Sequence, residues 1–288
     1  MNAFSRSWEI TKLTFGVINK DRELLGFALL SFIFSIAFTA AMVIPSIFST
    51  LLKDGFSQDS LTIFHYVIVF LTYFGLAFIA TFFNVCVVYT AKVRFEGGNA
   101  TFGESFRFAL SRLSVIVQWS LVSATVGLLL RLLDDFASRL GKIGEIVVNI
   151  ITSLLGLAWS ILTVFVVPVL VYENLGPIDA IKKSAEAIKR TWGESIIRSI
   201  GLGLVQLVVF VLIILVSGAL TYGLGYAFDI TGVLIGIAIG LCLLLLAGLI
   251  FSVANTIFKT ALYVYANTQT IPSGFSEELV RNAFKPKD

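Results

Sequence analysis

The sequence offers little material for catalysis, because it contains a single histidine, His65, among 288 residues. One histidine supplies neither a multi-histidine metal site nor a Ser-His-Asp arrangement with a choice of bases. His65 stands near the start of an apolar stretch without a charged neighbour, which favours a solvated helix-end residue over a general base. Acidic residues lie among lysines and arginines between the apolar stretches, and they form no pair within them. We therefore expect no enzymatic activity, no cofactor and no metal site.

Polar residues inside the long apolar stretches are the candidate functional residues. They are Asn84, Gln118, Asn149, Gln206, Asn255 and Lys259. An amide without a partner is costly in hydrocarbon, so each needs a hydrogen bond or water. One interpretation is hydrogen bonding between helices, worth about 1 kcal/mol per bond. The alternative is a polar path for a small solute or a lipid headgroup. Packing is favoured because amides without acids give a coupling ion no obvious set of ligands. Lys259 follows Asn255 by one helical turn, and its ammonium is expected to reach cytoplasmic water.

Small residues in the apolar stretches indicate close packing. Gly232, Gly236 and Gly240 recur every four residues, which places them on one side of a helix and lets a neighbouring backbone approach. We interpret this as packing within one chain, with homo-oligomerisation as the alternative. The two cysteines, Cys86 and Cys242, also lie in apolar stretches, which favours packing roles over a disulfide or a thiolate metal site.

The elements that position these residues are membrane-spanning helices. Hydrophobic residues make up 57% of the chain and charged residues only 14%, whereas soluble domains carry roughly a quarter charged residues. Most of the uncharged stretches exceed the roughly 20 residues that cross a bilayer as a helix. The six stretches are 24–52, 60–91, 113–130, 146–172, 199–228 and 230–258. The sequence therefore predicts an all-α, polytopic bundle with six transmembrane helices in a single membrane domain, 1–288. The first stretch is expected to be a retained signal anchor.

The distribution of positive charge predicts the orientation. Seventeen of the 21 Lys and Arg residues fall in the N-terminal segment, the second and fourth connections and the C-terminal segment. The positive-inside rule places those segments, and so both termini, in the cytoplasm of a multi-pass cell-membrane protein. The triplet Asn99-Ala100-Thr101 matches a glycosylation acceptor but lies in a predicted cytoplasmic connection. We interpret it as a chance match or as a helix cap. Arg131, Asp135 and Arg139 stand four apart and predict a solvated continuation of the third helix.

Short amphipathic helices are predicted in the cytoplasmic segments. Each has large apolar residues on one helical side and charged residues on the other. The apolar sides are Phe4, Trp8, Thr11, Phe15 and Ile18; Phe102, Phe106, Ala109, Leu113 and Val117; and Ile178, Ile181, Ala185, Ile188 and Trp192. Such helices are expected to lie in the membrane interface, with aromatic residues at headgroup depth and basic groups toward anionic lipid. One short helix before each pair of spans suggests weak repeats 1–97, 98–176 and 177–288, separated by Gly97-Gly98 and Gly176-Pro177.

Both ends of the chain resemble a family of uncharacterised six-helix membrane proteins of bacteria and archaea. The residues that carry the resemblance are Ser5-Arg6-Ser7-Trp8, Asn19-Lys20-Asp21-Arg22-Glu23-Leu24-Leu25, Ala261-Leu262-Tyr263-Val264-Tyr265-Ala266, Ile271-Pro272-Ser273-Gly274-Phe275 and Ala283-Phe284. The resemblance implies fold and topology but no active site. The chain is more loosely similar to the membrane portion fused to some glycerophosphodiester phosphodiesterases, whose catalytic barrel is absent here.

Three classes of function are compatible with these features. The favoured one is a scaffold or accessory subunit that organises other membrane components without catalysis. Such a function needs no special chemistry, and it suits a protein with small loops and exposed amphipathic helices. The alternatives are a small-solute or lipid transporter or pore lined by the intramembrane amides, and a lipid-binding membrane protein. The expected partners are membrane lipids and other membrane proteins, with a homo-oligomer as an option and no nucleic acid.

Overall fold

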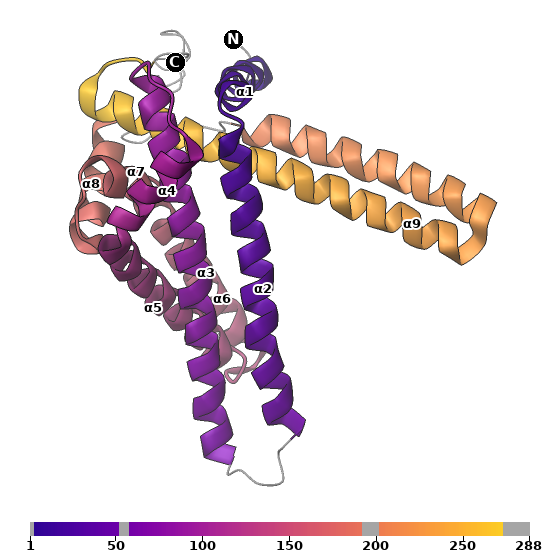
Figure 1. The fold of residues 1–288 in the computed structure, drawn as a ribbon. Coiled ribbons are helices and arrows are strands. Elements are labelled where there is room, and N and C mark those ends of the chain that lie inside the picture. The colour runs from indigo at the N-terminus through magenta and orange to yellow at the C-terminus, as the bar shows by residue number, and fades with distance from the viewer. Residues whose placement is uncertain (1–2, 52–57, 192–201, 273–288) are drawn as a thin grey trace. The chain divides into compact units, whose positions relative to one another are not determined.

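The structure is a computed structural model that describes residues 3–51, 58–191 and 202–272. The described part is all-α and contains no strand (Figure 1). Its elements are α1 (Ala3–Lys20), α2 (Glu23–Leu51), α3 (Gln58–Phe95), α4 (Phe102–Ser111), α5 (Leu113–Ala137), α6 (Gly141–Leu162), α7 (Val166–Tyr172), α8 (Pro177–Thr191) and α9 (Gly203–Thr268). Some predicted positions lie outside the described residues. They are residue 52, Trp192, residues 199–201, and the C-terminal motifs at 273–275 and 283–284.

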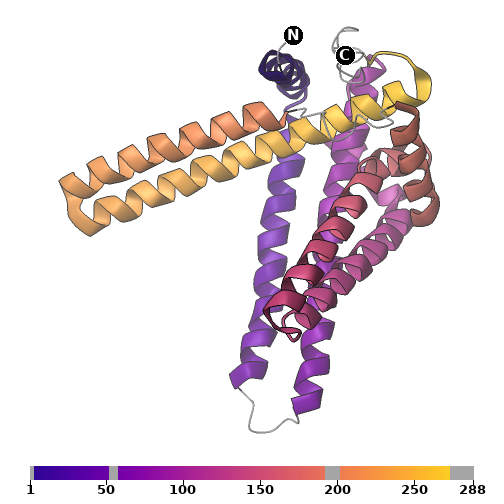
Figure 2. The ribbon, with the colours of Figure 1, turned by 180° about the vertical axis from the view of Figure 1, so that it is seen from behind.

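Among the residues that the structure describes, five helical segments are long and apolar enough to cross a membrane. They are Glu23–Ile44, Phe64–Phe95, Leu113–Ala137, Gly141–Tyr172 and Gly203–Thr268. The last is not one straight helix, because Phe228 and Asp229 have non-helical backbone angles. Asp229 lies at φ 51°, ψ −139°, and there the chain reverses, so that the two limbs of α9 lie side by side (Figure 2). Each limb is longer than the roughly 20 residues a span requires. The fifth segment thus contains both of the last two predicted spans, and the predicted all-α polytopic class is confirmed.

The chain forms two compact units, which are described separately. The first comprises residues 1–28, 90–100 and 190–288, and therefore contains α1, the first turn of α2, the end of α3 and α9. The second comprises residues 29–89 and 101–189, and contains most of α2 and α3 together with α4 to α8.

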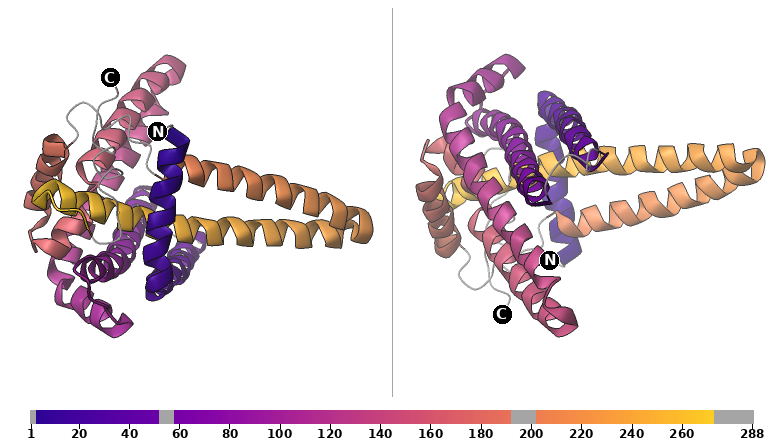
Figure 3. Two further views of the ribbon diagram at one scale, coloured as in Figure 1. Left: turned by 90° about the horizontal axis from the view of Figure 1, so that it is seen from above. Right: turned by 90° about the horizontal axis from the view of Figure 1, so that it is seen from below.

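In the first unit, α1 lies across α9 (Figure 3). The Ser7 hydroxyl accepts a hydrogen bond from the Val205 N–H, 3.4 Å away, in the first turn of α9. About two helical turns of α1 further on, the Phe15 ring meets the Phe251 ring edge-to-face at 6.0 Å. Phe210 meets Phe251 in the same way at 6.2 Å. The helix α1 therefore contacts both limbs of α9, and it meets the first limb near the beginning of that limb.

The side of α1 that packs on α9 overlaps the predicted apolar side in Thr11, Phe15 and Ile18. The buried residues are Ser7, Ile10, Thr11, Thr14, Val17 and Ile18. The hydroxyls of Thr11 and Thr14 are satisfied by carbonyls four residues earlier in the same helix, at 2.7 Å each, which permits their burial. Trp8, which periodicity grouped with Thr11 and Ile18, is 55% exposed.

The glycines of α9 lie against the opposite limb of the same hairpin. Gly232, Gly236 and Gly240 are all buried. A Cβ at Gly236 would stand 2.5 Å from the Cα of Thr221, and one at Gly240 would stand 2.8 Å from the Cβ of Ser217. Only a glycine fits such an approach, so these residues set the distance between the limbs.

In the second unit, aromatic side chains join α2, α3 and α4. Phe34 of α2 approaches Phe83 of α3, with ring centroids 5.9 Å apart. Phe82 of α3 meets Phe106 of α4 edge-to-face at 5.2 Å. Tyr89 and Phe108 stack at 4.2 Å. The short helix α4 is therefore fixed on α3 by two aromatic pairs, which each contribute roughly 1 kcal/mol beyond their buried area.

The break between α6 and α7 follows from Pro168. Proline lacks an N–H and its ring clashes with the carbonyl four residues earlier, so the helix is interrupted at 163–165. The Phe165 N–H, which is freed there, donates to the Ser184 hydroxyl of α8 at 3.1 Å. An ion pair of 3.5 Å between Lys183 and Glu173 adds a second link to α8. Because the buried backbone group finds a partner, α8 is held on this break.

The helices α5 and α6 run side by side and are joined by stacked tryptophans. The rings of Trp119 and Trp159 are nearly parallel, with centroids 5.7 Å apart. Beyond the apolar stretch, α5 continues to Ala137, and Arg131 pairs with Asp135 at 3.4 Å on its exposed surface. The helical continuation predicted from the four-residue charge spacing is confirmed as far as Ala137, and Arg139 lies beyond the end of α5.

Candidate functional site

A buried carboxylate marks the corner between α1 and α2. The Asp21 N–H donates to the Val17 carbonyl, and the Asp21 carbonyl accepts the Leu24 N–H, both at 3.1 Å. These bonds end one helix and begin the next within two residues. The side chain of Asp21 has no solvent exposure. A buried carboxylate requires a charged or hydrogen-bonding partner, because leaving it unpaired is costly.

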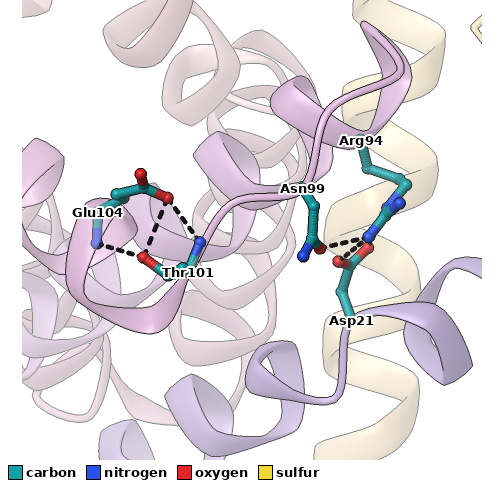
Figure 4. A network of polar contacts seen from close by, with 5 residues as sticks. All are labelled: Asp21, Arg94, Asn99, Thr101 and Glu104. Carbon is teal, nitrogen blue, oxygen red and sulfur yellow. Dashed lines mark hydrogen bonds and ion pairs between the residues drawn. The ribbon is translucent and has the colours of Figure 1, made fainter.

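That partner is Arg94, near the end of α3. Its Nε donates to one carboxylate oxygen of Asp21 at 2.6 Å, and its Nη2 donates to the other (Figure 4). The same Nη2 also donates to the side-chain oxygen of Asn99 at 2.6 Å. The planar guanidinium fork matches the carboxylate in two places, which fixes direction as well as distance. We refer to these three residues as the Asp21 cluster.

The turn after α3 brings Asn99 back to the arginine. Gly97 adopts φ 85°, a conformation in which glycine is favoured. The Gly98 N–H then donates to the Val93 carbonyl at 2.8 Å, which closes the turn. The Gly97-Gly98 pair thus has a local structural role at the end of α3. Sequence reasoning missed the cluster, because nothing in the sequence links Arg94 with Asp21.

The chemistry of the Asp21 cluster is structural. The carboxylate is engaged at both oxygens by a guanidinium that stays protonated, so it is not available as a general base. Arg94 keeps 23% of its side chain exposed and already donates three hydrogen bonds. The arrangement can hold two helix ends together, but it presents no nucleophile.

A capping box opens α4 in the second unit. The Glu104 N–H donates to the Thr101 hydroxyl oxygen at 3.3 Å, and the Thr101 N–H donates to the Glu104 carboxylate at 2.8 Å (Figure 4). The N–H of Thr101, followed by its hydroxyl, holds the pKa of Glu104 below its ordinary value, because both bonds favour the ionised form. The interpretation of Asn99-Ala100-Thr101 as a helix cap is thus confirmed for Thr101.

Two of the predicted intramembrane amides meet in the first unit. Asn255, in the second limb of α9, donates through Nδ2 to the side-chain oxygen of Gln206 in the first limb, at 3.4 Å. Both residues are half-buried. Lys259 stands one turn beyond Asn255 and is exposed. The two amides thus bind each other across the hairpin, and the lysine lies on its surface.

The other three amides belong to the second unit and do not meet each other in any observed hydrogen bond. Gln118 is exposed and donates to the Ser114 hydroxyl of its own helix at 3.1 Å. Asn84 is half-buried in α3 and is not without a partner. Asn149 is exposed on α6. Sequence position alone did not distinguish amides that are paired across helices from amides on a helix surface.

An apolar groove lies between α5 and α6, with a volume of about 580 Å³. Its lining is Val126, Leu129, Leu130, Leu132, Leu133, Leu155, Ala158, Trp159 and Leu162. None of the six predicted polar residues is part of that lining. His65 is exposed on α3, with its ring 6.0 Å from that of the adjacent Tyr66. Among the described residues, no group of three or more His, Cys, Asp or Glu side chains could hold a metal ion.

The long apolar helices, the hairpin α9 and the amides paired within it define a multi-pass α-helical membrane protein. The chain belongs to a family of unknown function, DUF6159, which matches residues 63–275. No curated protein matches the sequence. Family membership agrees with the resemblance to an uncharacterised membrane family and assigns no role to any residue.

Proposed function

We propose that the chain is a scaffold or accessory subunit that organises other proteins in the membrane and performs no catalysis. The observation that carries this proposal is a stripe of small and polar residues on α6. Asn149, Ser153, Gly156 and Ser160 follow one another at spacings of three and four, which puts them on one side of the helix. We call them the α6 stripe. Such a surface lets another spanning helix approach closely and form hydrogen bonds.

Within its own unit, the α6 stripe is not covered by another helix. Along Gly141–Leu162 no residue is buried. Gly156 has no heavy atom within 4 Å of the position that a Cβ would take, apart from its own helix and chain neighbours. An exposed amide such as Asn149 needs a hydrogen-bond partner at membrane depth. The glycines of α9 provide the contrast, because their side of the helix is already covered by Ser217 and Thr221.

The arrangement of the amides supports a scaffold over a conduit. Asn255 bonds Gln206, and Gln118 bonds a serine of its own helix. The 580 Å³ groove is lined by apolar side chains, so it offers a polar solute no hydrogen bonds. A lipid-binding function is the second candidate, because the same groove suits an acyl chain. The looser resemblance to the membrane portion of glycerophosphodiester phosphodiesterases points the same way, without catalytic residues.

Photo-crosslinking from α6 tests the scaffold. A benzoylphenylalanine at Ser153, in the α6 stripe, is expected to form protein adducts in native membranes, whereas one at Ile151 forms only lipid adducts. Ile151 is a matched control because it is 49% exposed on the other side of the same helix. Gly156→Leu should remove the protein adducts, since it fills the stripe without a clash inside its own unit. Lipid adducts alone at both positions would contradict the scaffold.

Orientation and interfacial placement complete the proposal. The positive-inside rule supports cytoplasmic termini and a cell-membrane location, with α1, α4 and α8 in the cytoplasmic interface. The partner at the α6 stripe is proposed to be another membrane protein. A second copy of this chain is the alternative outcome of the crosslinking experiment, distinguished by the mass of the adduct.

A further inference from the structure

The outer face of α1 combines an exposed tryptophan with lysines. At roughly 100° per residue, Trp8, Lys12, Gly16 and Lys20 fall within about a third of the helix circumference. Trp8 is 55% exposed, and Lys12 and Lys20 are exposed. We call these four residues the α1 outer face. The opposite side of α1 contains Ile10, Thr14 and Val17, which are buried.

The packing of α1 fixes this face in direction and in depth. Ser7 binds the Val205 N–H in the first turn of α9, where the first apolar limb of the hairpin begins. The helix α1 therefore crosses the hairpin at the end of a span, which is the level of the lipid headgroups. Because the buried side rests on α9, the outer face is turned away from that hairpin.

The residue types of the α1 outer face match a particular environment. Tryptophan is enriched at headgroup depth, because its ring is largely apolar while its N–H can be hydrated. Lysines near the membrane surface are each attracted to anionic lipid by about 1 kcal/mol. Gly16 stands between Lys12 and Lys20, and a Cβ there would meet no heavy atom within 4 Å outside its own helix. The face thus leaves open space between two ammonium groups.

We propose that the α1 outer face is a docking surface for the headgroups of anionic phospholipids in the bilayer that holds the spans. The indole of Trp8 sits at the boundary between headgroups and acyl chains, and Lys12 and Lys20 contact lipid phosphates on either side of Gly16. Glu9 falls within the same third of the helix circumference and is exposed, so the attraction depends on the two lysines outnumbering it. The surface is independent of which proteins the chain organises.

Fluorescence quenching of Trp8 by brominated lipids tests the proposal on the full chain in vesicles. The signal of Trp8 is the difference between the wild type and Trp8→Phe, since the chain has 4 tryptophans. Two vesicle preparations carry the same phosphatidylcholine to phosphatidylglycerol ratio and the same bromine content. In one the bromine is on phosphatidylglycerol and in the other on phosphatidylcholine. Quenching is expected to be at least twofold stronger with brominated phosphatidylglycerol.

Charge reversal separates headgroup recognition from simple burial. Lys12→Glu should remove the preference for the anionic lipid, because it places a second carboxylate beside Glu9. Its Trp8 signal is the difference between the Lys12→Glu variant and the double variant Lys12→Glu with Trp8→Phe. Lys142→Glu is the matched control, as Lys142 is an exposed lysine of the second unit, and it should leave the preference unchanged. Equal quenching by both brominated lipids in the wild type would overturn the proposal. So would quenching by aqueous iodide without quenching by lipid.

Discussion

Arg94 and Asp21 stand 73 positions apart in the sequence and form a two-point ion pair in which the aspartate has no solvent exposure. The pair ties the α1–α2 corner to the end of α3, and Asn99 binds the same guanidinium. Because every oxygen of the carboxylate is engaged, the pair specifies one arrangement of these chain segments. This arrangement also fixes where α1 ends, and so supports the helix that carries Trp8 and Lys12.

Arg94→Ala is expected to lower the free energy of unfolding by about 2 kcal/mol, because it leaves the Asp21 carboxylate buried and unpaired. This loss of stability is smaller than that expected for a fully buried ion pair, since Arg94 keeps 23% of its side chain exposed. Arg94→Lys should cost roughly half as much, because an ammonium retains the charge but not the two-point geometry. Thermal unfolding in detergent measures both.

Arg131→Ala is the matched control for that experiment. Its ion pair with Asp135 is more exposed, at 54% and 34% of the two side chains, and should contribute less than about 1 kcal/mol. The double variant Asp21→Asn with Arg94→Gln should be more stable than Arg94→Ala, since no unpaired charge remains. Equal loss from Arg94→Ala and Arg131→Ala would show that the Asp21 cluster has no special structural role.

Gly236→Ala is expected to destabilise α9 by about 1–3 kcal/mol, because the added methyl would stand 2.5 Å from the Cα of Thr221 and force the limbs apart. Gly248→Ala is the control in the same helix, with nothing within 4 Å of its Cβ position, and should be neutral or stabilising by up to about 1 kcal/mol. The midpoint of thermal unfolding distinguishes them. An unchanged midpoint for Gly236→Ala would contradict the close approach of the limbs.

The first turn of α4 should loosen in acid. The pKa of Glu104 is lowered by the Thr101 N–H and hydroxyl, so the ionised carboxylate stabilises the folded state. That contribution is present above the unfolded pKa of a glutamate and disappears as the pH falls through the lowered folded pKa. Hydrogen exchange of the first-turn amides, corrected for intrinsic rates, is therefore expected to rise as the pH drops below the pKa of an ordinary glutamate. Thr101→Ala should raise exchange at neutral pH and remove most of the pH dependence.

Thiol labelling tests the orientation. In a background without Cys86 and Cys242, Gly98→Cys and Gly176→Cys should resist a membrane-impermeant reagent in intact cells, while Gln58→Cys should react. The reason is that both glycines lie in connections rich in Lys and Arg, which the positive-inside rule retains in the cytoplasm. Reaction at position 98 without reaction at position 58 would reverse the topology.

The sequence predicted the features that depend on composition or on neighbouring residues. Long uncharged stretches predicted the spans, and Thr101 and Glu104, three residues apart, form the cap within one helical turn. It did not predict Arg94 with Asp21, because each is an ordinary charged residue at a helix end until the fold brings them together. The same reason explains the hydrogen bond from Phe165 to Ser184, which exists only because Pro168 interrupts a helix.

Periodicity grouped part of the packed side of α1 correctly. Of the predicted apolar side, Thr11 and Ile18 are buried and Phe15 contacts Phe251. The packed side also includes Ser7 and Thr14, which a hydrophobic pattern does not select. Their burial depends on hydrogen bonds that only the fold shows, from the Val205 N–H to Ser7 and from Thr14 to a carbonyl of its own helix.

The pairing of Asn255 with Gln206 distinguishes a scaffold from a conduit most directly. Asn255→Leu, Gln206→Leu and the double variant are to be compared for thermal stability and for solute and ion flux in reconstituted vesicles. The account predicts that either single variant loses about 1 kcal/mol of stability, that the double variant loses little more, and that permeability stays at the level of the wild type. Unchanged stability together with altered flux would contradict it, because the amides would then line a path.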